Sequence, residues 1–201
     1  MSAASRVDGR ALRRERSLER IAEAYLDLLT EGALRPTADQ LAARAGVSRR
    51  LIFSCYANLE ELFAAVITRQ AARLQTLVEA AEGPGTFEVR VRRFVKARVD
   101  LYEEIAPVRR AALLSPHGSP RIREALAAFR AHKRAQATRV FAPELARWSG
   151  AAGRQRRAAA HALTSFSGWS ALHVEQGTSS AETRAILRRA LRALLLDEAA
   201  R

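Results

Sequence analysis

The chain has 201 residues, of which 48% are hydrophobic and 27% charged, and its formal net charge is +13. This composition excludes a disordered or fibrous chain, and the length allows one medium domain or a small domain joined to a larger one. The single cysteine, Cys55, excludes an internal disulfide framework and a cysteine-built zinc site. We therefore expect a globular protein of a reducing compartment.

The positive charge favours a polyanionic partner such as nucleic acid, but it is spread along the chain. Residues 1–50 carry ten arginines and seven acidic residues, a net of +3, which leaves +10 for the remainder.

No apolar run approaches the roughly 18 residues needed to span a bilayer, and residues 1–9 lack the apolar core of a signal peptide. We expect a cytoplasmic protein with no membrane partner.

Hydrophobic positions recur at intervals of three and four residues, and strand-like alternation of useful length is missing from the sequence. This spacing, with many alanines, leucines and arginines, predicts an all-α fold of about nine helices. We expect these helices at about 13–30, 37–45, 49–56, 59–81, 86–106, 107–114, 121–141, 154–176 and 180–198. Loops are expected at 115–120 and, with one helical turn, at 143–153.

The clearest break is Gly83-Pro84-Gly85, which ends the long fourth helix. We predict a flexible arm over residues 1–12, a first domain over 13–74 and a second domain over 75–201. The helix that ends at this break would belong partly to both domains.

Two short amphipathic helices lie on either side of Gly46. Thr37 has the chemistry to cap the first and Ser48 to cap the second. Two such helices need a third to bury their apolar sides, and the segment 13–30 supplies it. A three-helix unit of this kind can present its last helix to the major groove of DNA, which is wide enough to admit one helix.

Residues 14–70 resemble the helix-turn-helix DNA-binding domain of the TetR family of transcriptional regulators. The resemblance rests on Glu31-Gly32 after the first helix, Pro36-Thr37 before the second, and the runs Leu41-Ala42-Ala43-Arg44-Ala45-Gly46-Val47-Ser48 and Asn58-Leu59-Glu60-Glu61-Leu62-Phe63. It implies a C-terminal helical domain that binds an effector and dimerises. The implied function is a dimeric, sequence-specific DNA-binding regulator, a repressor released from an inverted-repeat operator in double-stranded DNA by a small molecule of unknown identity.

Carried over by position, the resemblance implies DNA contacts from eight residues: Thr37, Arg44, Ser48, Arg49, Arg50, Leu51, Ser54 and Tyr56. Thr37 would hold a phosphate, and Arg49 and Arg50 would reach base edges, where an arginine pairs bidentately with guanine. Tyr56 is equally a candidate for the core. Phe53 replaces the tyrosine usual in this family and Leu59 replaces a common phosphate-binding lysine, which predicts an operator unlike that of common relatives.

The second half supplies candidates for dimerisation and effector binding. A helical hairpin at the C-terminus favours a homodimer interface formed by Ala162, Phe166, Trp169, Ile186, Ala190 and Leu194, although some of these could instead form the protomer core. Candidates for the effector site are side chains with a polar or aromatic group near an apolar stripe: Phe94, Arg98, Tyr102, His132 and Trp169. If Arg98 enters the site, an anionic effector is favoured.

Two alternatives come from other classes of protein. An enzyme is disfavoured because the four histidines (His117, His132, His161 and His173) lack metal-ligand spacing and no nucleophile motif accompanies a sheet. We expect no metal and no cofactor. The second alternative is a DNA-binding adaptor of the same fold that a protein partner controls in place of a small molecule.

Overall fold

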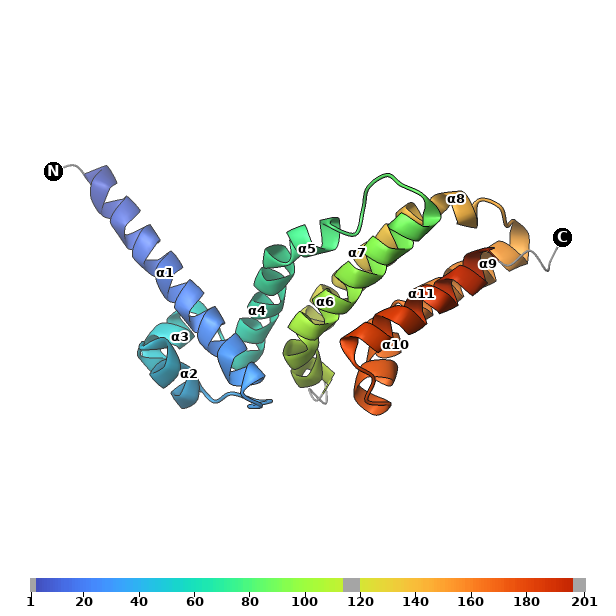
Figure 1. Ribbon diagram of the computed structural model, residues 1–201. Helices are drawn as coiled ribbons and strands as arrows, with labels where there is room; N and C mark the ends of the chain where they lie inside the picture. Colours follow the sequence, from blue (N-terminus) through green and yellow to red (C-terminus); the bar gives the residue numbers. More distant parts are fainter. Residues whose placement is uncertain (1–2, 114–119, 197–201) are drawn as a thin grey trace. The chain divides into compact units, whose positions relative to one another are not determined.

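A computed structural model describes the backbone of residues 3–113 and 120–196, and the side chains from residue 12 onward (Figure 1). In these ranges all regular structure is helical, which confirms the predicted all-α fold. The α-helices are α1 (Ala3–Thr30), α2 (Ala38–Ala45), α3 (Arg49–Cys55), α4 (Leu59–Arg73), α5 (Gln75–Glu79), α6 (Phe87–Leu113), α7 (Pro120–Val140), α8 (Ala142–Leu145), α9 (Gly150–Leu163), α10 (Phe166–Ser170) and α11 (Ser180–Leu196). A π-helical turn, Ala171–Glu175, follows α10.

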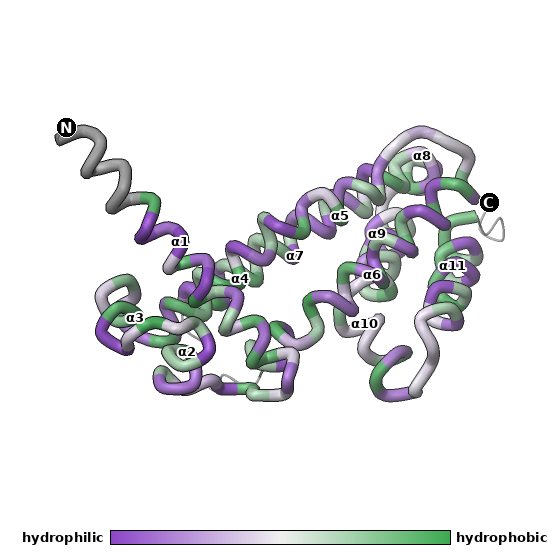
Figure 2. The backbone as a smooth tube through the Cα atoms, turned by 60° about the vertical axis from the view of Figure 1, so that its left-hand side comes forward, coloured by the Kyte–Doolittle hydropathy of each residue, from purple (hydrophilic) through white to green (hydrophobic). Residues whose placement is uncertain are grey.

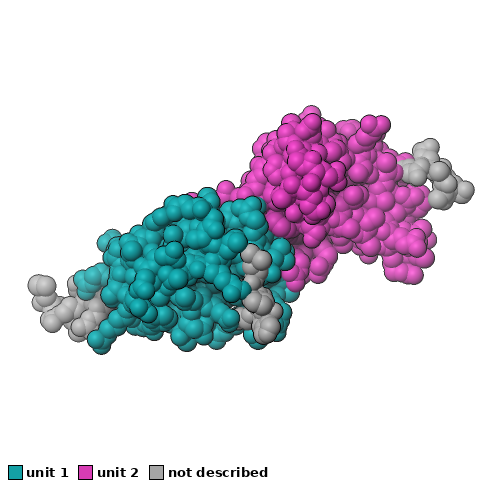
Figure 3. Space-filling view, turned by 90° about the horizontal axis from the view of Figure 1, so that it is seen from below, with its two compact units in different colours: residues 1–72, 106–127 teal, residues 73–105, 128–201 magenta. Residues whose placement is uncertain are grey.

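The chain forms two compact units, coloured separately in Figure 3. Unit 1 comprises residues 1–72 and 106–127, and unit 2 comprises residues 73–105 and 128–201. Both α6 and α7 therefore contribute residues to each unit. The contribution of 106–127 to the first unit was not predicted, because periodicity identifies an apolar face and not its partner.

The core of unit 1 joins α1 to the three helices that follow it. Ile21 of α1, Leu41 of α2, Ile52 of α3 and Leu62 of α4 are all fully buried in it. Tyr25 and Phe63 stack with ring centroids 5.3 Å apart. The same core takes in Val108 and Ala111 from the end of α6 and Ile122 from the start of α7.

The core of unit 2 is rich in aromatic residues. Phe94 meets Phe141 edge to face at 5.0 Å, and Tyr102 meets Phe166 in the same way at 5.6 Å. On α11, residues Leu187, Leu191 and Leu195 recur every fourth position and are buried. The hydropathy pattern along the backbone in Figure 2 shows hydrophobic and hydrophilic positions interleaved along the helices, as this one-sided burial requires.

Several predicted boundaries were wrong. Helix α1 begins at Ala3 and not at residue 13, since helix-favouring alanines and arginines extend it from its packed segment. The predicted helix 59–81 is interrupted at Leu74, which leaves α-helical geometry at φ −91° and ψ 7°. The predicted loop 115–120 lies almost entirely outside the described residues, as do the last residues of the helix predicted to end at 198.

The largest difference concerns Pro107, which was predicted to separate two helices. It lies inside the continuous helix α6. A proline there removes one backbone hydrogen bond and costs about 3 kcal/mol. Buried side chains on both sides, Leu101 and Ile105 before it and Val108 after it, offset this cost by holding both segments in place.

None of the individual helices between residues 3 and 196 combines the length and hydrophobicity required to cross a bilayer. Only α3 and α4 together meet that composition, as a pair bent by 71°. Their apolar side chains, Ile52 and Leu62 among them, lie in the core of unit 1.

Candidate nucleic-acid interface and effector site

The start of α2 is fixed by a capping box. The Thr37 hydroxyl accepts a hydrogen bond from the backbone N–H of Gln40 at 3.2 Å, and the Gln40 side chain accepts one from the backbone N–H of Thr37 at 2.8 Å. Thr37 is exposed. Because its backbone N–H is already engaged, a phosphate at this position would have to use the hydroxyl proton or displace Gln40.

The turn between α2 and α3 requires glycine. Gly46 lies in the left-handed region at φ 60°, and a Cβ atom there would stand 2.6 Å from Nη2 of Arg20. This guanidinium donates to the carbonyl of Ala45 and, at 2.9 Å, to that of Gly46. Arg20 thereby ties the turn between α2 and α3 to α1.

Helix α3 separates one buried side from one exposed side. Ser48 caps it by accepting from the backbone N–H of Leu51 at 3.2 Å. Ile52 is the buried anchor, whereas the exposed residues Arg49, Arg50, Phe53 and Ser54 fall within one arc of the helix. Leu51 is half-buried. The helix thus presents two guanidinium groups and one aromatic ring to solvent.

The arginines of this region differ in their freedom to bind a ligand. Arg49 makes a loose exposed ion pair with Asp39 at 3.3 Å, and Arg50 has no acidic partner among the described side chains. Exposed pairs of this kind contribute about 0–1 kcal/mol and are readily exchanged. Arg44, in contrast, holds both oxygens of Glu31 at 2.8 and 2.6 Å, and this pairing lowers the pKa of Glu31.

The remaining predicted contacts have intramolecular roles as well. Ser54 donates from its hydroxyl to the carbonyl of Leu51 at 2.8 Å. Tyr56 is half-buried against the unit 1 core, and burial raises the pKa of its hydroxyl. Within the predicted set, Arg49 and Arg50 therefore have exposed and weakly engaged side chains, whereas the exposed hydroxyls of Thr37 and Ser48 also cap helices.

A second cluster of functional interest lies inside unit 2. Four of the five effector candidates, Phe94, Arg98, Tyr102 and Trp169, are buried there. The Arg98 guanidinium lies over the Phe94 ring at 4.6 Å, and the rings of Tyr102 and Trp169 are 6.0 Å apart. The fifth candidate, His132, is exposed on α7.

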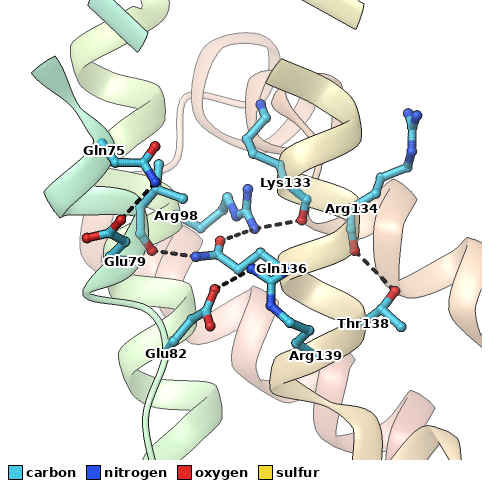
Figure 4. Close-up of polar contacts among 10 residues, drawn as sticks. Gln75, Glu79, Glu82, Arg98, Lys133, Arg134, Gln136, Thr138 and Arg139 are labelled. Atoms are coloured by element: carbon cyan, nitrogen blue, oxygen red, sulfur yellow. Dashed lines mark hydrogen bonds and ion pairs between the residues drawn. The ribbon is translucent and has the colours of Figure 1, made fainter. Parts of the chain in front are cut away.

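Helix α7 adds two polar residues that the sequence did not single out (Figure 4). Gln136 accepts from Nη2 of Arg98 at 3.0 Å and donates to the carbonyl of Val78. Lys133 directs Nζ toward the Tyr102 hydroxyl at 3.4 Å, and that hydroxyl donates to the carbonyl of Thr164 at 2.6 Å. A buried polar network thus connects α6 and α7 with the end of α9.

Comparison with known proteins gives matches at the level of structure. No family model and no curated protein matches the chain. A protein of Mesorhizobium loti assigned to the TetR family of transcriptional regulators matches with a TM-score of 0.69 at 15% identity, over 92% of this chain and 96% of that one. A TetR-family transcriptional regulator of Streptomyces coelicolor matches with a TM-score of 0.71 at 19% identity, over 90% of this chain and 80% of that one.

The chain has the TetR-family fold. This confirms, for the architecture, the resemblance inferred from residues 14–70. Within the TetR fold, Arg49 and Arg50 lie on the second helix of the helix-turn-helix, and Arg98 lies in the C-terminal helical half.

The predicted dimer residues of this TetR fold divide into two groups. Phe166 and Trp169 are buried within the protomer, in contact with each other and with Tyr102. Ala162 and Ile186 are exposed, and Ala190 and Leu194 are half-buried. Ile186, Ala190 and Leu194 recur every fourth residue on α11, beside the buried stripe, so they form a second apolar stripe that faces outward.

Lys133 and Gln136 were missed because nothing local distinguishes them in an arginine-rich chain. The spacing of Phe129, Lys133 and Gln136 at four and three residues places them on one helix face. The available signal was a polar pair, Lys133 and Gln136, on the helix face that also carries the apolar residues Phe129 and Val140.

Proposed function

We propose that the chain is a dimeric, sequence-specific DNA-binding transcriptional regulator that acts in the cytoplasm. The observation that carries this proposal is the exposed pair Arg49 and Arg50 on a short helix capped at Ser48, in a chain with the TetR fold. A helix of this size fits the major groove, and its two arginines match the guanine edge.

We propose a dimer because a single small domain buries limited surface on DNA, and binding to two half-sites increases affinity. The outward stripe of Ile186, Ala190 and Leu194 on α11, with Ala162 on α9, is the proposed contact between subunits. Small and medium apolar side chains allow two such helices to approach a symmetry-related pair.

We further propose that the protein is a repressor released from its operator by a small molecule bound in unit 2. Helices α6 and α7 run without interruption from the Arg98 cluster in unit 2 to residues packed in the core of unit 1. A shift of either helix at the ligand would alter the packing of Val108 and Ile122 near the DNA-binding helices. The helix predicted over 59–81 is interrupted at Leu74, so we propose α6 and α7 as the mechanical link in its place.

Footprinting of the purified protein on the DNA upstream of its own gene tests the proposed function. We expect a protected inverted repeat with half-sites about one helical turn apart, and an affinity that falls steeply as salt rises. Uniform, sequence-independent protection would contradict the proposal, as would a protein that sediments as a monomer at the concentrations that protect DNA.

A further inference from the structure

The guanidinium of Arg98 is buried in unit 2 without full hydrogen bonding. The residue is only 2% exposed, and its Nη1 atom has no hydrogen-bond partner. The other terminal nitrogen, Nη2, donates to Gln136 and, at 3.3 Å, to the carbonyl of Lys133. A buried cation needs an anion or a full set of hydrogen-bond acceptors to offset the free energy of its lost hydration. The two neutral acceptors of Arg98 offset only part of this free energy.

A second cation lies close to Arg98, and two acids of this unit, Glu144 and Asp100, pair with other arginines and a lysine. Lys133 is also buried, and its Nζ stands 4.5 Å from the centre of the Tyr102 ring. Among the described residues the one buried acid is Glu144, which is paired with Arg90. Asp100, two positions after Arg98, pairs with Lys96 and Arg184 at 2.6 Å each. Among the described residues, no carboxylate therefore pairs with the Arg98 guanidinium.

Burial lowers the pKa of Arg98, and the neighbouring Tyr102 acts in the opposite direction. An arginine remains protonated in proteins even so, because its pKa starts far above neutrality. The charge consequently stays in the core. Replacing a buried charge by an apolar side chain of similar volume often leaves the stability of a protein unchanged or increases it. A structural role alone therefore does not require an arginine at position 98.

The geometry around Arg98 resembles a prepared donor site. Gln136 is held by its bond to the Val78 carbonyl, and it in turn holds the guanidinium against the Phe94 ring. The indole Nε1 of Trp169, whose ring lies 6.0 Å from that of Tyr102, is a second buried donor without a partner. Two unused donors among aromatic rings suit a ligand with an anionic acceptor group and an apolar body.

We propose that unit 2 binds a small organic carboxylate, whose oxygens accept from Nη1 of Arg98 and whose apolar body lies against Tyr102 and Trp169. The assignment of this ligand as the effector rests on the proposed function, whereas the binding site itself does not. Because Nη1 is inaccessible to solvent, the ligand enters only when side chains between α6 and α7 move apart. Binding is then necessarily coupled to the packing of the two helices that continue into unit 1.

Melting curves and calorimetry in the absence of DNA test this proposal. The probes are two carboxylates of different shape, benzoate and decanoate, each compared with its neutral amide. We expect at least one carboxylate to raise the melting temperature and to bind at least tenfold more tightly than its amide. The Arg98→Met variant should lose this preference and should melt at or above the temperature of the unmodified protein, since an incompletely paired charge leaves the core.

Arg184→Met serves as the matched control, because it removes a paired arginine from the same unit, and it should keep the preference for the carboxylate. Equal binding of each carboxylate and its amide, including no binding of either, overturns the proposal. A carboxylate preference that survives in Arg98→Met overturns it as well. Failure of the protein to protect DNA would refute the proposed function and leave this binding result unaffected.

Discussion

Replacing Arg49 and Arg50 together by alanine should weaken binding to the operator by roughly a hundredfold or more. A bidentate contact between arginine and guanine contributes about 1–3 kcal/mol of discrimination. Even one such contact per subunit, at about 1.5 kcal/mol, amounts to about 3 kcal/mol across a dimer, and each 1.4 kcal/mol is a tenfold change in affinity. Fluorescence anisotropy with a labelled operator duplex measures the loss. Both side chains are exposed, so the melting temperature should hardly change.

The matched control is Arg130→Ala with Arg147→Ala, which removes the same charge from exposed positions in unit 2. If the DNA interaction depended only on net charge, both double variants would lose the same affinity. We expect the control to retain nearly all of it. Equal losses in the two variants would show that α3 does not read the operator.

Ile52→Ala should be the most damaging single substitution in the DNA-binding helix. Ile52 is the one fully buried side chain of α3, so it attaches the helix to unit 1. Its truncation removes that contact and leaves a cavity, at a cost of about 2–5 kcal/mol. Thermal unfolding followed by circular dichroism should show a lower melting temperature, and operator binding should fall because α3 is no longer held in one orientation.

Phe53→Ala is the control on the same helix. Phe53 is 45% exposed, so its truncation should cost little stability. Its ring can still contact a thymine methyl group, so a change of operator preference is compatible with this account. An Ile52→Ala protein that melts like the unmodified chain, or a Phe53→Ala protein that is equally destabilised, would contradict the packing described for α3.

Local signals predicted the helix-turn-helix well because its determinants are short-range. Thr37 and Ser48 cap the helices that the sequence assigned to them, and Gly46 adopts the left-handed conformation that the turn requires. Pro107 was misread because its local cost was weighed without the burial on either side of it. That burial depends on tertiary partners, which a single sequence does not specify.

The candidate sites show the same limit. The sequence selected Phe94, Arg98 and Tyr102 as side chains near an apolar stripe, and the structure brings these three together with Trp169. The sequence alone could not place Lys133 against Tyr102, because the two residues are 31 positions apart and meet only when α6 and α7 pack. Arg44 was assigned to DNA by position alone, and only the structure shows that Glu31 already holds its guanidinium.

The most direct test of the central claim, that two copies of α3 read DNA together, is a change in the spacing of the half-sites. One operator duplex keeps the natural inverted repeat, and a second has about five base pairs inserted at its centre, which rotates one half-site by about half a turn. Titration of both duplexes by anisotropy should show at least tenfold weaker binding to the second, with two subunits bound per natural operator. Equal affinity for the two duplexes, or a single subunit bound at saturation, would contradict the account.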